Sequence, residues 1–183
     1  MERIDPRARS DAYGNRINRS HSTFLATVVP WGSILLASIL PLFPIASALP
    51  LLPPLGFLML LGWRLVRPGL LPVWAGIPLG LFDDLFSGQP FGFAILTWSI
   101  ALIGIEILEG RLPWRAFWQD WFTAGIVVSV YLIVGWLLSG ATPNIHSLIA
   151  LVPQLVLSIL LFPILSRIVA RLDRFRLHRW RTI

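Results

Sequence analysis

Long apolar stretches alternate along this chain with short clusters of arginine. The 183 residues contain three stretches without an internal basic residue, from Phe24 to Arg64, from Arg67 to Arg111 and from Arg115 to Arg167. A membrane-spanning helix needs about 20 apolar residues, so each stretch is long enough for two passes and is predicted to form a helical hairpin. The six expected spans are residues 24–43, 47–63, 70–86, 91–109, 118–138 and 147–169.

The positions of the basic residues predict how these spans are oriented. All 15 basic residues are arginines, and they lie in the first 20 residues, after the second and fourth spans, and from residue 167 onward. The three expected hairpin tips, at 43–48, 87–90 and 139–147, contain none. Because basic loops stay in the cytoplasm, six spans with both termini cytoplasmic place every arginine on that side.

Composition supports a polytopic membrane protein. Hydrophobic residues make up 56% of the chain and charged residues 13%, about half the charged fraction of a soluble protein. There is no cysteine, which excludes a disulfide scaffold and thiolate metal sites. A disordered basic cytoplasmic tail (residues 1–23) and an Arg-rich cytoplasmic amphipathic extension (170–183) are expected to flank the transmembrane domain (24–169). The arginines are expected to attract anionic lipids at the cytoplasmic face rather than nucleic acid.

Four acidic residues fall within or beside the expected spans, where an ionisable group is costly and by default functional. They are Asp83, Asp84, Glu106 and Glu109. The two glutamates share one helical face and are expected to form an ion-pair cluster with Arg111 or Arg115. The aspartates are expected near the opposite membrane face, at about 1.5 Å of rise per residue. The two pairs are therefore too far apart to form a two-carboxylate active site.

Gly76, Gly80 and Asp84 recur at intervals of four and so lie on one stripe of the third span. Glycines at this spacing allow another helix to approach closely, which makes the stripe a candidate surface for a partner helix. Asp84 is expected to accept hydrogen bonds from backbone amides of the turn formed by residues 87–90 and to close the hairpin. A partner or ligand contact is the alternative for this carboxylate. Trp98, in the middle of the fourth span, is expected to be a packing residue.

No set of residues in the sequence predicts catalysis or metal binding. The three histidines, His21, His146 and His178, are far apart in the sequence, and a metal site needs several converging ligands. Neither a Ser/His/Asp set nor a phosphate-binding glycine loop is present. We therefore expect a protein that is not an enzyme and has no cofactor.

The segment from Arg67 to Gly92, RPGLLPVWAGIPLGLFDDLFSGQPFG, resembles the rod-shape-determining protein MreD family. The likeness lies in Arg-Pro-x-x-Leu-Pro before the third span and Gly-x-x-x-Asp-x-x-Ser-Gly-x-Pro-x-Gly at its end. Asp83 is a second acid beside the aspartate of the motif. The candidate motif and partner-contact residues are Arg67, Pro68, Pro72, Gly76, Gly80, Asp84, Ser87, Gly88, Pro90 and Gly92.

This resemblance implies a non-enzymatic scaffold of the bacterial cell-wall elongation complex in the inner membrane. The implied partners are MreC, the MreB filament system and the peptidoglycan synthases. It also implies an all-α fold of six transmembrane helices that resembles the substrate-binding subunit of energy-coupling-factor transporters.

Two other functions fit the same layout. A vitamin-type substrate-binding or permease subunit would use a pocket near Asp84, Asn144, His146 and Gln154, which share one predicted depth. An enzyme acting on lipid headgroups would need a nucleophile or metal cluster near an interface, and the sequence contains no such cluster.

Overall fold

A computed structural model of the chain describes residues 23–42, 52–111, 117–139 and 145–176, and these residues contain helices and connections but no strand. The expected all-α class is confirmed. The α-helices are α1 (Thr23–Ile39), α3 (Leu55–Val66), α4 (Gly76–Phe86), α5 (Phe93–Arg111), α6 (Phe117–Leu138) and α7 (Ile145–Arg176). Two short 3₁₀ turns, η1 (Leu40–Leu42) and η2 (Val73–Ala75), follow α1 and precede α4.

Three of the helices, α5, α6 and α7, are long and apolar enough to cross a membrane. They coincide with the last three expected spans. The helices within the second and third expected spans are shorter than predicted, because α3 has 12 residues and α4 has 11. A crossing needs about 20 helical residues, so the count of six spans stays a prediction.

Prolines explain why α3 and α4 are short. Pro54 stands immediately before α3, where its missing N–H costs nothing. At the other end Pro68 disfavours helical backbone in Arg67, which adopts φ −133° and ψ 81°. Pro72 is likewise extended, with ψ 152°, before the turn that leads into α4. Each proline therefore fixes a helix end that hydrophobicity alone does not mark.

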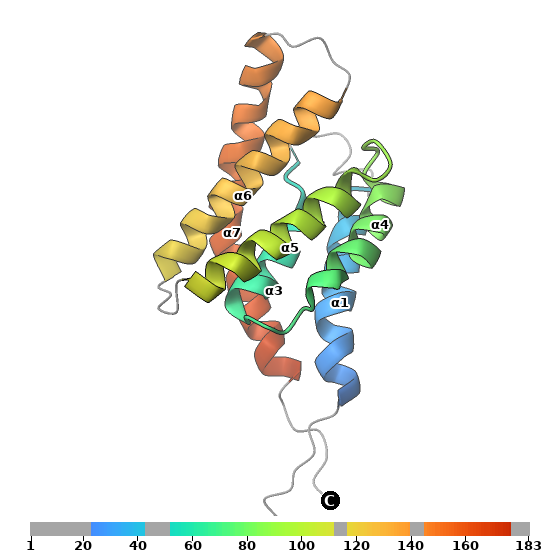
Figure 1. The fold of residues 1–183 in the computed structure, drawn as a ribbon, viewed down its shortest axis with the longest axis vertical. Helices are drawn as coiled ribbons and strands as arrows, with labels where there is room; N and C mark the ends of the chain where they lie inside the picture. Colours follow the sequence, from blue (N-terminus) through green and yellow to red (C-terminus); the bar gives the residue numbers. More distant parts are fainter. Residues whose placement is uncertain (1–22, 43–51, 112–116, 140–144, 177–183) are drawn as a thin grey trace, which may run out of the picture.

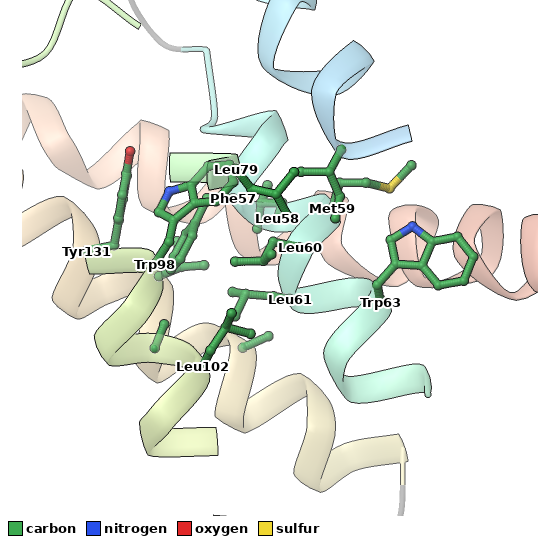
Figure 2. Close-up of a cluster of buried hydrophobic side chains, with 14 of the residues drawn as sticks. Phe57, Leu58, Met59, Leu60, Leu61, Trp63, Leu79, Trp98, Leu102 and Tyr131 are labelled. Carbon is green, nitrogen blue, oxygen red and sulfur yellow. The ribbon is translucent and has the colours of Figure 1, made fainter. Parts of the chain in front are cut away.

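Helix α3 lies at the centre of the bundle. It packs against α1 and α7, while α4 packs against α5 and α6 against α7 (Figure 1). All ten residues from Gly56 to Leu65 are buried, as expected of a helix that is apolar all round and enclosed by protein. Figure 2 shows Trp63 leaving α3 on the side opposite to Trp98 and Tyr131. Trp98 is fully buried, which confirms it as a packing residue, and Trp63 is also fully buried.

The arginine-bearing ends of the helices lie toward one end of the bundle. The connection from α3 to α4 and the ends of α5 and α7, which carry arginines among the described residues, all lie in the lower half of the helical body in Figure 1. Helix α7 continues through the last expected span and into the first part of the predicted extension, up to Arg176. The expected disordered tail, apart from Thr23 at the start of α1, and residues 177–183 lie outside the described residues.

Candidate functional site

The glycine stripe of α4 faces α5 of the same chain. A Cβ atom added at Gly76 would lie 2.8 Å from the backbone nitrogen of Ser99. One added at Gly80 would lie 2.7 Å from the carbonyl carbon and oxygen of Ala94. The close approach predicted for the stripe is therefore confirmed, but the helix that uses it is α5. The stripe is not a free surface for a partner helix, which corrects the sequence-based expectation.

Asp84 caps the first turn of α5. Its carboxylate accepts hydrogen bonds from the backbone N–H groups of Gly92 (3.0 Å), Ala94 (2.7 Å) and Ile95 (3.3 Å). The first amides of a helix have no partner within the helix and carry a partial positive charge, so a carboxylate there is doubly favourable. The hairpin-closing role predicted for Asp84 is confirmed. The amides that it binds lie two to five residues beyond the 87–90 turn in which they were expected.

Backbone conformation makes this cap possible. Gly88 and Gly92 adopt φ +67° and +91°, which favours glycine because a Cβ atom is strained there. Gly88 ends α4 just after Ser87, and the carbonyl of Pro90 accepts the N–H of Phe93 at the start of α5 (3.0 Å). The motif residues from position 84 onward thus build one tight connection between two packed helices.

The neighbouring Asp83 faces a different group of helices. It is buried, and its Oδ1 atom lies 2.9 Å from the position that a Cβ atom at Gly56 of α3 would take. The Oγ atom of Ser38, on α1, lies 2.2 Å from the same position. Three helices therefore meet where α3 has no side chain. No partner of Asp83 could be predicted, because nothing in the sequence links residues 38, 56 and 83.

An aromatic group packs around Tyr131 in the same part of the core (Figure 2). Its ring stacks on Phe57 with centroids 4.4 Å apart and lies 5.0 Å from the ring of Phe93. The ring of Trp98 lies 5.9 Å from that of Phe57, and its indole N–H has no hydrogen-bond partner among the described residues. Such rings fix the mutual orientation of α3, α5 and α6 by shape.

A buried arginine organises the opposite end of α4 and α5. Arg64 is 1% exposed and forms ion pairs with Glu106 and, at 2.8 Å, with Glu109. It also donates to the carbonyl of Leu71 at 3.2 Å. The expected ion-pair cluster exists, and it contains a cation from α3 that the prediction did not name, whereas Arg115 lies outside the described residues. The prediction considered only arginines close in sequence, whereas the pairs span 42 and 45 residues.

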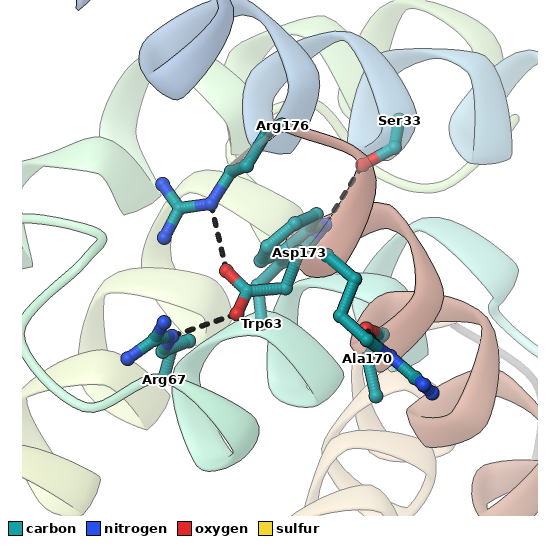
Figure 3. Close-up of polar contacts among 7 residues, drawn as sticks. Ser33, Trp63, Arg67, Ala170, Asp173 and Arg176 are labelled. Atoms are coloured by element: carbon teal, nitrogen blue, oxygen red, sulfur yellow. Dashed lines mark hydrogen bonds and ion pairs between the residues drawn. The ribbon is translucent and has the colours of Figure 1, made fainter. Parts of the chain in front are cut away.

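A second polar group joins α3 to the end of α7 (Figure 3). Asp173 accepts from Arg67 at 2.8 Å and from Arg176 at 2.7 Å. The guanidinium carbon of Arg176 lies 5.8 Å from the ring centre of Trp63, whose indole N–H donates to Ser33 Oγ at 2.8 Å. Sequence reasoning missed Asp173, although it is the one acidic residue among the C-terminal arginines.

The ten candidate residues therefore do not form one site. Arg67, Pro68 and Pro72 belong to the connection before α4, the two glycines of the stripe lie within α4, and the others cap the opposite end of α4. What the motif builds is a helical hairpin that is packed along its length and tied at both ends.

Two of the four residues of the alternative substrate pocket bind backbone groups of this chain. Asp84 binds the backbone of α5, and Gln154 donates to the carbonyl of Leu52 at 2.8 Å. Asn144 lies outside the described residues, as does the side chain of His146. Within the described part of the chain no three His, Cys, Asp or Glu side chains are grouped so as to hold a metal ion.

The chain matches no protein-family model, no curated protein and no solved structure.

Proposed function

We propose that this chain is a non-enzymatic scaffold of the MreD type in the bacterial inner membrane. It binds MreC and supports rod shape and lateral peptidoglycan synthesis together with the MreB system and the synthases. The observation that carries the proposal is the motif from Arg67 to Gly92. The structure supports the proposal in that the motif residues shape a hairpin of two closely packed helices.

The proposal includes six membrane crossings with both termini in the cytoplasm. The even number follows from the confinement of arginine to alternate connections and tails. The gathering of the arginine-bearing helix ends toward one end of the bundle supports it. The two short helices, α3 and α4, are flanked by proline-containing connections that contribute to the crossings, and α3 is enclosed by protein, which tolerates irregular backbone at membrane depth.

The partner surface on α4 is its outward face. Ile77, Leu81 and Leu85 are exposed, apolar and spaced by four, so they form one ridge that lies about 100° around α4 from its glycines. Helices associate in lipid through close van der Waals packing, because lipid provides no hydrophobic drive between them. This ridge replaces the glycine stripe as the place where a single-span partner helix docks.

Photocrosslinking in cells tests this surface. A photoreactive benzoylphenylalanine at Leu85 is expected to crosslink a single-span protein with a large domain outside the cytoplasm. The matched control is Ile126 on α6, because both side chains are 64% exposed. The expected product should form from position 85 and not from position 126. Equal products from both positions, or none from position 85 or 81, would count against α4 as the docking helix.

Depletion of the chain tests the function itself. Rod-shaped cells that lose it are expected to become round while the membrane stays intact, because lateral wall synthesis loses its scaffold. Cells that keep their shape after depletion would contradict the proposed role, whatever the crosslinking result.

A further inference from the structure

A cavity of about 310 Å³ opens between α1, the connection from α3 to α4, and the last turn of α7. The indole rings of Trp31 and Trp74 line it, with centroids 5.7 Å apart. Pro30, Leu70 and Pro72 add further apolar surface. The volume is at the lower end of the range for sites that bind small molecules.

Among the described residues that line the cavity, Arg176 is the one that is charged. Its side chain is buried, its Nε atom donates to Asp173, and its guanidinium lies over the ring of Trp63 (Figure 3). Trp63 is held in turn by Ser33. The guanidinium is thus fixed in place beside an apolar cavity, and a ligand that binds it does not have to order a long flexible side chain.

The local charge favours an anion. Asp173 is shared by Arg67 and Arg176, and these three groups together carry a charge of +1. Guanidinium N–H groups match the oxygens of a phosphate in geometry as well as in charge. A phosphate monoanion is the simplest complement to this triad.

The apolar walls and the position of the cavity identify the rest of the ligand. A small soluble anion would leave the two indole rings and the prolines uncovered, whereas an acyl chain would cover them. The cavity lies among the arginine-bearing ends of the helices, and tryptophan rings favour the boundary between headgroups and acyl chains. We infer that the cavity binds one anionic phospholipid, with its phosphate at Arg176 and the first part of an acyl chain along Trp31 and Trp74. This is a defined site, beyond a general attraction of the arginines for the membrane surface, and it does not depend on the proposed scaffold function.

Native mass spectrometry of the full chain in detergent, titrated with phosphatidylglycerol, tests the site. A saturable complex with one lipid is expected. Phosphatidylcholine with the same acyl chains is expected to bind about tenfold more weakly, because its headgroup carries no net charge for Arg176 to neutralise. Equal affinity for the two lipids would overturn the assignment of the phosphate to Arg176.

Two variants separate the two parts of the site. Trp74→Ala removes part of the apolar wall, and its matched control is Trp118→Ala, since the two residues are 60% and 63% exposed. Trp74→Ala is expected to weaken phosphatidylglycerol binding about tenfold, and Trp118→Ala to leave it unchanged. Arg176→Gln is expected to abolish the preference for the anionic lipid, while Arg174→Gln keeps it. If Arg176→Gln fails to fold, the comparison of Trp74→Ala with Trp118→Ala and the comparison of the two lipids still test the site.

Three results would overturn the inference. The first is an equal loss of binding in Trp74→Ala and Trp118→Ala. The second is displacement of the lipid by glycerol phosphate at similar concentration, which would make the ligand a soluble phosphate. The third is a photoreactive residue at position 74 that crosslinks a polypeptide in place of lipid, which would make the cavity a protein contact.

Discussion

At the scale of single residues, buried charges in this chain pair across helices and so decide which helices lie together. Arg64 joins α3 to α5, and Asp173 joins α7 to the end of α3. Breaking a buried pair leaves an uncompensated charge, which costs more than the intact pair contributes. Apolar helices can pack together in several ways of similar energy. These ion pairs disfavour the alternatives, because any packing that separates the partners leaves a buried charge unpaired.

Gly56 shows that the packing of α1, α3 and α4 also depends on a single missing side chain. Gly56→Ala is expected to destabilise the protein by about 1–3 kcal/mol, because the new Cβ atom would lie 2.2 Å from Ser38 Oγ and 2.9 Å from Asp83 Oδ1. The control is Gly104→Ala on α5, where a Cβ atom meets nothing within 4 Å. Thermal unfolding in detergent should show a lower melting temperature for the first variant only. Equal melting temperatures for both variants would refute the close contact of α1, α3 and α4.

At the scale of elements, the ends of helices are set by proline, glycine and one carboxylate. The prolines before α3 and after it limit that helix to 12 residues. Helices α4 and α5 pack closely, with no side chain between the backbones at Gly80 and Ala94. Asp84 closes the same pair by binding amides of the next helix, so the hairpin is both packed and capped.

Asp84→Ala is expected to cost about 2 kcal/mol, the upper end for the loss of a helix cap, because three amides lose their acceptor. Asp84→Asn keeps one acceptor oxygen and should be intermediate. Hydrogen exchange should become faster at the amides of Gly92, Ala94 and Ile95. Unchanged protection of these amides in Asp84→Ala would show that the carboxylate does not cap α5.

At the scale of the whole molecule, the lengths of the apolar helices and the positions of the arginines both fit a membrane protein. Helices α5, α6 and α7 suit a membrane by length and composition, and their outward faces carry large exposed apolar side chains such as Ile103, Ile126 and Leu160. Exposure of such surfaces to water would be unfavourable, whereas contact with the acyl chains of lipid would not be. In the proposed topology, the arginines of the α3–α4 connection and of the ends of α5 and α7 set the direction in which the bundle is inserted.

Topology can be measured directly because the chain has no cysteine of its own. Ser87→Cys, at the exposed tip between α4 and α5, is expected to react with a membrane-impermeant maleimide in intact cells. Ser10→Cys and Thr182→Cys should react only after the membrane is permeabilised, since both termini are proposed to be cytoplasmic. Labelling of either terminus in intact cells would contradict the six-span topology.

From the sequence alone one could predict the helical class, the three long apolar helices, the close approach at the glycine stripe and the closing role of Asp84. These features depend on runs of apolar residues and on spacings of three or four, which are local properties of the chain. The three-dimensional packing was needed to show that α5 fills the glycine stripe, that Arg64 pairs with Glu106 and Glu109, and that Asp173 joins two arginines 106 and 3 residues away. Several helix pairings bury similar apolar area, and sequence periodicity gives the face of a helix but not the identity of the helix that covers it.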